Sequence, residues 1–207
     1  MGEAIKEIFE LEGIVVASTA VEKDTIKVEG CLERERVGCP RCGCNHTIFK
    51  GKKKRNFHIP PVGSRRGQLE VLLRRNQCTE CKYAWWPQLA LAHGKQRMSK
   101  SFITHVIDLL KMGTVNDVAK HLRVGWDLVK DIHKNYLQDL YKEIDISDLE
   151  YVSIDEFAIR KGHSYMTVVS DCKSGRIVHA IEGRKAEDIQ PFLKQLKKKA
   201  RIFEELR

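Results

Sequence analysis

Four cysteines stand in two pairs at the spacing that metal-binding knuckles use. They are Cys39, Cys42, Cys78 and Cys81, with 35 residues between the two pairs. Each short pair lets two sulfurs converge on one ion, and four thiolates match the tetrahedral coordination of zinc. A closed site of this kind holds structure and performs no chemistry, so we expect a structural Zn²⁺. Cys44 and His46 lie beside the first pair, and either could replace one of the four ligands.

Positive charge is concentrated in the segment that contains these cysteines. The net charge is +9, and residues 39–100 alone hold 14 Lys and Arg against 2 Asp and Glu. A polyanion such as DNA is the natural partner of this block, with a solvated basic face as the alternative. The residues that we expect to contact DNA here are Lys52, Lys53, Lys54, Arg55, Arg65, Arg66, Arg74 and Arg75. A β-hairpin around the metal site, with strands at 47–49 and 69–73, would carry them.

A third group of residues has the pattern of a helix-turn-helix. The inner faces of its two helices would be Val115, Val118, Ala119 and Leu122, then Leu128, Val129 and Ile132, with the turn at 123–125. The outward residues of the second helix, where a recognition helix meets the major groove, include Trp126, Asp127, Lys130 and Lys134. A simple αα-hairpin that packs on its neighbours is the alternative.

A single carboxylate, Asp155, stands among apolar residues in a predicted strand over 151–159. A buried carboxylate is costly unless it binds a metal or finds a hydrogen-bond donor. Enzymes that cut phosphodiesters with two metals place carboxylates on paired strands, where the metals activate the attacking oxygen and stabilise the leaving one. An exposed or salt-bridged aspartate is the alternative.

The surrounding patterns predict a multidomain α+β chain. Residues 1–38 favour an N-terminal β element, with strands near 14–16 and 26–28, and residues 39–97 a zinc-ribbon-like, basic β domain. Residues 99–147 favour the helical helix-turn-helix domain. Residues 148–207 contain three short strands, with turns at 161–163 and 172–175, and a final helix that has Glu187 and Asp188 in its first turn.

The sequence also excludes several classes of protein. No apolar run reaches the length of about 18 residues that a membrane span needs. The N-terminal segment MGEAIKEIFELEG is acidic, unlike a signal peptide. The cysteine number is odd, at seven, which points away from a disulfide framework. We therefore expect a cytoplasmic protein that does not bind membranes.

The whole chain resembles the ISL-three family of insertion-sequence transposases. The resemblance includes CPRCG, the returning RRNQCTEC, and the helix-turn-helix. Its most specific part is IDEFAIRKGHSYMTVVSD with the following SGRIV and EGRKAEDI, because this part keeps its spacing across three strands and a helix start.

The resemblance implies that residues 148–207 begin a ribonuclease-H-like domain with catalytic carboxylates of the Asp-Asp-Glu kind. Asp155 corresponds to the first acid. Glu156 would point to the opposite face of the strand, and Asp171 precedes a turn that an aspartate commonly nucleates. The family's second and third acids lie beyond the shared stretch, so Mg²⁺ would bind only if the site were completed.

These observations lead to three hypotheses about function. The first is a truncated transposase that binds DNA, at the terminal inverted repeats of its element, and lacks a complete catalytic site. The alternative is a zinc-ribbon and helix-turn-helix regulator without catalytic activity. The third is an active nuclease that uses Asp155 with Glu156 or Asp171. The first two share DNA binding, and the sequence leaves a homo-oligomer open.

Overall fold

The structure, a computed structural model, divides into two compact units, residues 1–137 and 138–207. It describes residues 2–33, 38–94, 96–142, 144–160 and 164–205, with the backbone alone over 198–205. None of the helices in these ranges is long and apolar enough to cross a membrane.

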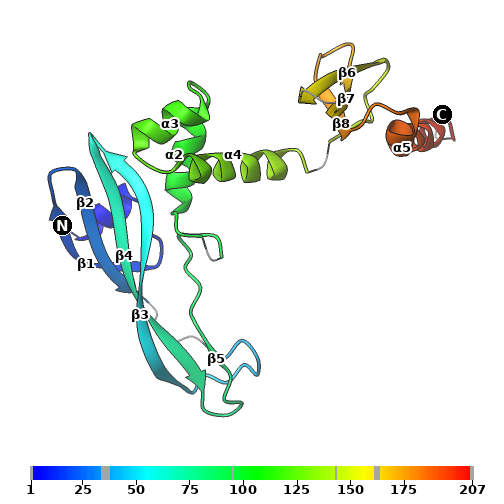
Figure 1. The fold of residues 1–207 in the computed structure, drawn as a ribbon. Helices are drawn as coiled ribbons and strands as arrows, with labels where there is room; N and C mark the ends of the chain where they lie inside the picture. The colour runs from blue at the N-terminus through cyan, green and yellow to red at the C-terminus, as the bar shows by residue number, and fades with distance from the viewer. Residues whose placement is uncertain (1, 34–37, 95, 143, 161–163, 206–207) are drawn as a thin grey trace. The chain divides into compact units, whose positions relative to one another are not determined.

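A five-stranded sheet forms the first part of unit 1 (Figure 1). Its elements are α1 (Gly2–Ile8), β1 (Ile14–Val21), β2 (Thr25–Leu32), β3 (Thr47–Val62), β4 (Arg65–Cys78) and β5 (Ala84–Trp85). The strand order is β1-β2-β4-β3, and β5 pairs with the C-terminal end of β4. β2 runs parallel to β4, whereas the other neighbours are antiparallel. The N-terminal strands and the cysteine-bearing hairpin therefore belong to one sheet.

The β3–β4 hairpin is the longest feature of this sheet and is visible in Figure 1 as a twisted ribbon. Phe57, Leu69 and Val71 are buried on one face, in a core that also takes Phe9 and Leu11 from the segment after α1. Because side chains alternate between the faces of a strand, the opposite face carries polar residues.

Three helices complete unit 1: α2 (Lys100–Leu110), α3 (Val115–Leu122) and α4 (Trp126–Leu140). Ser99 caps α2, and Thr114 caps α3 in a capping box with Asp117. Their buried core consists of Phe102, Val106, Ile107, Val118, Ala119, Leu122, Val129 and Ile132. The five residues of α3 and α4 in this list were all predicted to face inward, so the predicted helix-turn-helix is confirmed in its packing.

The start of α2 is fixed to strand β3 at His58. The His58 N–H donates to the carbonyl of Arg97, and the Ser99 N–H donates to the carbonyl of His58, both at 2.9 Å. The imidazole of His58 lies 5.5 Å from the ring of Phe102, between centroids. Since His58 is four residues from the end of β3, the helices are attached close to the turn of the hairpin.

Unit 2 is an antiparallel sheet followed by a helix. The elements are β6 (Val152–Arg160), β7 (Ser164–Asp171), β8 (Ile177–Glu182) and α5 (Ala186–Glu205), and the strand order is β6-β7-β8. The core contains Val169 and Val178 from the strands, Ile189 and Phe192 from α5, and Ile146. The three predicted strands, the turn at 172–175 and the helix are confirmed, while the turn expected at 161–163 lies outside the described residues.

One predicted element differs at the N-terminus. We expected only strands over residues 1–38, but helix α1 precedes β1. It is only seven residues long and none of them is buried, although Ile5 packs partly against the core, so its apolar periodicity is too short to identify a helix from the sequence. Its apolar contribution to the core comes mainly from Phe9 and Leu11, just after its end.

Candidate metal centre and nucleic-acid interface

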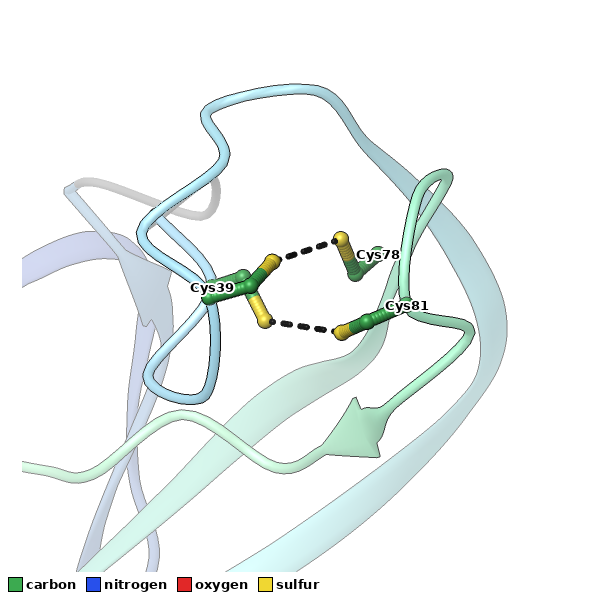
Figure 2. A group of neighbouring side chains, drawn as sticks. Cys39, Cys78 and Cys81 are labelled. Atoms are coloured by element: carbon green, nitrogen blue, oxygen red, sulfur yellow. Dashed lines mark hydrogen bonds between the residues drawn. The ribbon is translucent and has the colours of Figure 1, made fainter.

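The two cysteine pairs meet at the end of the β3–β4 hairpin opposite its turn (Figure 2). The Sγ atoms of Cys39 and Cys81 are 3.6 Å apart, as are those of Cys42 and Cys78. All four Sγ atoms lie within 4.8 Å of one another. In the described part of the chain, this is the one group of three or more His, Cys, Asp or Glu side chains close enough to hold a metal ion.

The geometry of these sulfurs fits a tetrahedral ion. Zinc–sulfur bonds of about 2.3 Å place the sulfurs of a tetrahedral site about 3.8 Å apart. The two observed separations of 3.6 Å are close to this value. The four-cysteine cluster can therefore hold a metal ion without rearrangement of the hairpin.

The two knuckles have the same backbone conformation. The N–H of Cys39 donates to the carbonyl of Cys44, five residues on, and the N–H of Cys78 donates to that of Tyr83, also five residues on. The residue after the second cysteine of each pair is left-handed, with φ of 72° at Gly43 and 59° at Lys82. Two unrelated segments thus form equivalent turns whose cysteines point to a common centre.

These turns also favour thiolates at the first cysteine of each pair. Burial opposes ionisation of Cys78, but N–H groups of its own knuckle, that of Cys81 first, lower its pKa to about 6. The pKa of Cys39 is lowered in the same way, against burial, by the N–H groups of its knuckle, with Cys42 first. For Cys42, the N–H of Cys44 favours the thiolate, but the neighbouring sulfurs and burial raise the pKa to about 12. A cation would compensate the negative charge that such a cluster gathers.

Neither alternative ligand belongs to the cluster. Cys44 Sγ accepts a hydrogen bond from the N–H of His46 at 3.3 Å, and the cluster of four contains neither residue. Of the sequence candidates, the structure brings together Cys39, Cys42, Cys78 and Cys81.

The predicted DNA-contacting residues of the basic block separate into three groups along the hairpin. Lys52, Lys53, Arg74 and Arg75 lie toward the metal end, whereas Lys54 and Arg55 lie near the middle, opposite Leu72 and Val71. The expectation that the whole block surrounds the metal site does not hold for Arg65 and Arg66, which begin β4 at the opposite end of the hairpin. The reason is the length of the strands, which extend far beyond the predicted segments at 47–49 and 69–73.

Some basic residues of β3 also have partners within the protein. The Lys54 ammonium pairs with Glu70, which raises the pKa of that lysine. Arg55 donates to the carbonyl of Gln96 at 3.1 Å. The Lys53 ammonium lies 3.9 Å from the ring centroid of Trp86, while burial, and then the charges of Arg55 and Arg75, lower its pKa.

The predicted contact residues of the second helix of the helix-turn-helix are exposed on α4. They are Trp126, Asp127, Lys130 and Lys134. Trp126 is the first residue of α4 and is 48% exposed, although it is a large apolar side chain. The Lys130 ammonium lies 5.1 Å from its ring centroid, one turn further along the helix. An exposed aromatic ring and a lysine at the start of a recognition helix suit contacts with bases and phosphates.

The turn of the helix-turn-helix lies beside the turns of the sheet. Arg123, which is left-handed at the end of α3, approaches Asp24 with 3.6 Å between Nη1 and Oδ1. Asp24 belongs to the β1–β2 turn, and its carbonyl accepts the N–H of Arg66 at 2.9 Å. Sequence patterns do not indicate that these residues are neighbours, because they come from three distant segments.

Asp155 is exposed in edge strand β6, and its Oδ1 accepts the N–H of Glu156 at 2.8 Å. It pairs with Val168, whereas Glu156 pairs with the buried Thr167. Since neighbouring residues of a strand alternate between faces, Asp155 and Glu156 lie on opposite faces, as expected. The alternative of an exposed aspartate therefore describes Asp155 in this structure.

Asp171 has a local structural role. Its carboxylate accepts hydrogen bonds from the N–H groups of Lys173 and Ser174, both at 3.1 Å, and from the Ser174 hydroxyl. The Ser174 hydroxyl first, and then these N–H groups, lower its pKa even though burial opposes this. Asp171 therefore organises the turn before β8, as the sequence suggested.

Comparison with known protein families gives two matches. A family model described as "Helix-turn-helix domain of transposase family ISL3" matches residues 91–137, which include α2, α3 and most of α4. A second model of the same family, of the DDE type and described as "Transposase", matches residues 152–204, from β6 into α5.

Curated proteins with similar sequences are transposases of insertion elements. The chain is 32% identical over 158 residues to the transposase for insertion sequence element IS1001 of Bordetella parapertussis, covering 76% of this chain and 39% of that protein. It is 37% identical over 67 residues to the transposase for IS1557 of Mycobacterium tuberculosis, covering 32% of this chain and 15% of that protein. The matched stretches thus span well under half of each relative. No solved structure matches the chain.

Proposed function

The chain belongs to the ISL3 family of insertion-sequence transposases, and we propose that these 207 residues bind the DNA ends of such an element. The DNA would be the terminal inverted repeats. The observation that carries this proposal is α4, which packs as the second helix of a helix-turn-helix and leaves Trp126, Lys130 and Lys134 exposed. Tight packing of Val129 and Ile132 against α2 and α3 would hold these side chains rigidly for a major groove.

The four-cysteine cluster supports DNA binding indirectly. We propose that it holds Zn²⁺, with Cys39, Cys42, Cys78 and Cys81 as the ligands. Without a metal, this end of the hairpin is held by the last rungs of the β3–β4 ladder, by the short pairing of β4 with β5 and by hydrogen bonds from Thr79 to the carbonyl of His46. The ion would fix Lys52, Lys53, Arg74 and Arg75, toward the metal end of the hairpin, in one arrangement, so that their charges meet DNA phosphates without a large ordering cost.

We propose that Asp155 is the first of the three carboxylates of the family's catalytic site, in a domain of ribonuclease-H-like fold. Two-metal phosphodiester chemistry needs several carboxylates around the ions, which would be Mg²⁺. Within the described residues, Asp155 does not belong to any group of three potential metal ligands. This 207-residue stretch is therefore proposed to bind DNA without cutting it.

One experiment tests both parts of the proposal, which are that the chain binds the DNA ends of an element and that this stretch does not cut DNA. The 207-residue chain is titrated onto a duplex of an element's inverted repeat and onto a shuffled duplex of equal length. We expect tighter binding to the repeat, and a loss of that preference in Trp126→Ala and Lys130→Ala. Equal binding to the two duplexes would favour the alternative function, a regulator that recognises other DNA. Magnesium-dependent nicking that disappears in Asp155→Ala would overturn the proposal that this stretch is inactive.

A further inference from the structure

Most of the positive charge of the β3–β4 hairpin lies toward its two ends, with Lys52, Lys53, Arg74 and Arg75 at the metal end and Arg65 and Arg66 at the turn. Between Arg55 and Arg65, no residue of β3 or its turn is Lys or Arg, and β4 has none between Arg66 and Arg74. Lys54 and Arg55 lie near the middle of the ladder, where Lys54 pairs with Glu70 and Arg55 donates to the carbonyl of Gln96. The middle of the hairpin therefore carries less net positive charge than either end, and DNA phosphates would be attracted mainly to the ends.

The two ends are about one turn of DNA apart. Lys52 pairs with Arg74 near the metal end, and Val62 pairs with Arg65, nine residues before Arg74 on β4. A strand rises about 3.3 Å per residue, so these rungs are about 30 Å apart. One helical turn of B-DNA is about 34 Å long.

The turn end of the hairpin is next to the helix-turn-helix. Asp24 contacts both the hairpin and the helix-turn-helix. Its carbonyl accepts a hydrogen bond from the N–H of Arg66, and its carboxylate approaches the guanidinium of Arg123. The other acid of the β1–β2 turn, Glu22, pairs with Lys27. Both arginines of the hairpin turn are exposed, and neither forms a salt bridge with any residue that the structure describes.

We infer that the hairpin makes two separate contacts with DNA, one at each end. Arg65 and Arg66 contact phosphates beside the groove that α4 enters, and the metal end contacts phosphates about one helical turn away. This inference rests on the proposed function, since it assumes that α4 binds DNA. Beyond the binding of α4, it adds a second DNA contact at the metal end of the hairpin. It also fixes the distance between the two contacts along the DNA at about one helical turn.

Two matched double variants test the inference. Arg65→Gln with Arg66→Gln removes two neighbouring arginines from one end of β4, and Arg74→Gln with Arg75→Gln removes two from the other. Each protein is titrated at several salt concentrations onto a duplex of about 30 base pairs, long enough for both ends, and onto a hairpin stem of about 8 base pairs, which is too short. Unchanged melting temperatures show that the variants fold.

On the long duplex, each pair should lower the slope of log K against log salt by roughly 1 to 2, because each lost phosphate contact removes about 0.9. The two losses should add in the quadruple variant. On the short stem, either end can bind alone, so each double variant should leave the slope nearly unchanged and only the quadruple variant should lower it.

The outcomes separate this inference from the proposed function. If the wild-type chain does not bind the long duplex, both fail. If Lys130→Gln weakens binding but Arg65→Gln with Arg66→Gln does not change the slope, only the inference fails. Equal losses on the long and short DNA would also overturn it, since the ends would then share a single contact.

Discussion

The carboxylate of Asp24 lies 3.6 Å from the guanidinium of Arg123, which joins a turn of the sheet to the turn of the helix-turn-helix. Both side chains are more than half exposed, so the pair contributes little to stability, roughly 0 to 1 kcal/mol. Its larger effect is on charge, because Asp24 offsets one arginine at the place where the chain is proposed to meet DNA.

Replacing Asp24 by asparagine should therefore strengthen DNA binding. The change frees Arg123 and removes a negative charge near the phosphates, so we expect affinity to rise roughly two- to fivefold at low salt, with less gain at high salt. Fluorescence anisotropy with a labelled duplex measures the change. Asp108→Asn, which removes an equally exposed acid paired with Lys111 on α2, is the matched control. An equal gain in DNA affinity in both variants would mean that the affinity depends on the net charge of the chain and not on the position of Asp24.

Metal removal should loosen one end of the hairpin and leave the rest of unit 1 folded. The half of the hairpin near His58 is held by the sheet core and by α2, whereas the knuckles have few other anchors. A chelator, or Cys78→Ser, should speed amide hydrogen exchange in residues 39–49 and 76–85 and leave α2 to α4 protected.

The exposed Cys172, which lies outside the cluster, supplies the control for this measurement. Cys172→Ser should retain one zinc per chain by elemental analysis, and Cys78→Ser should lose it. A Cys78→Ser protein with full zinc content and normal exchange would rule out the metal site.

Stability should fall in mild acid because of His58. Burial, and then the charge of Arg66, lower the pKa of this half-buried imidazole. Below the ordinary histidine pKa of about 6.5, the unfolded chain takes up a proton before the folded chain does, so the free energy of unfolding decreases as pH falls. The melting temperature of the wild type should therefore drop more between about pH 7 and pH 5 than that of His58→Gln. His93→Gln, at an exposed position, should lose as much melting temperature over this pH range as the wild type. If His58→Gln also loses as much as the wild type, His58 is not the cause of the acid sensitivity.

Gly67→Ala should open the turn end of the hairpin. A Cβ at this position would lie 2.4 Å from the carbonyl oxygen of Pro60 and 2.7 Å from that of Ile59, and these backbone atoms cannot move without breaking the ladder. We expect a loss of about 1 to 3 kcal/mol in urea unfolding, together with weaker DNA binding. At Gly113, a new Cβ would meet its nearest atom at 3.7 Å, so Gly113→Ala should be well tolerated. Equal stability of the two variants would contradict this account.

Local patterns in the sequence were sufficient for the helix-turn-helix and for the metal knuckles. Val118, Ala119 and Leu122 recur at helical spacing, and the Cys-x-x-Cys pairs have a spacing set by the coordination of one ion. The strands of unit 2 were predicted for a similar reason, because short β-branched runs are separated by turn residues.

Long-range pairing could not be predicted in the same way. The parallel pairing of Val28 with Leu69 joins segments 41 residues apart, and nothing local specifies it. The strand predicted at 47–49 stopped short of the lysines at 52–54, although these occupy exposed positions of one continuous strand. The separation of Arg65 and Arg66 from the metal site follows from these two features, and so became visible only in the structure.

The exposure of edge strand β6 affects how Asp155 can be studied. Ile154, Phe157 and Ile159 are each at least 40% exposed on this strand, and such an edge is a template for aggregation. Asp155 and Glu156 interrupt the apolar run and act as gatekeepers against self-association. Asp155→Ala therefore removes a gatekeeper as well as a proposed metal ligand, and we expect it to sediment more than the wild type at equal concentration. Asp155→Glu keeps the charge and the solubility while displacing the carboxylate, which makes it the cleaner substitution for cleavage assays.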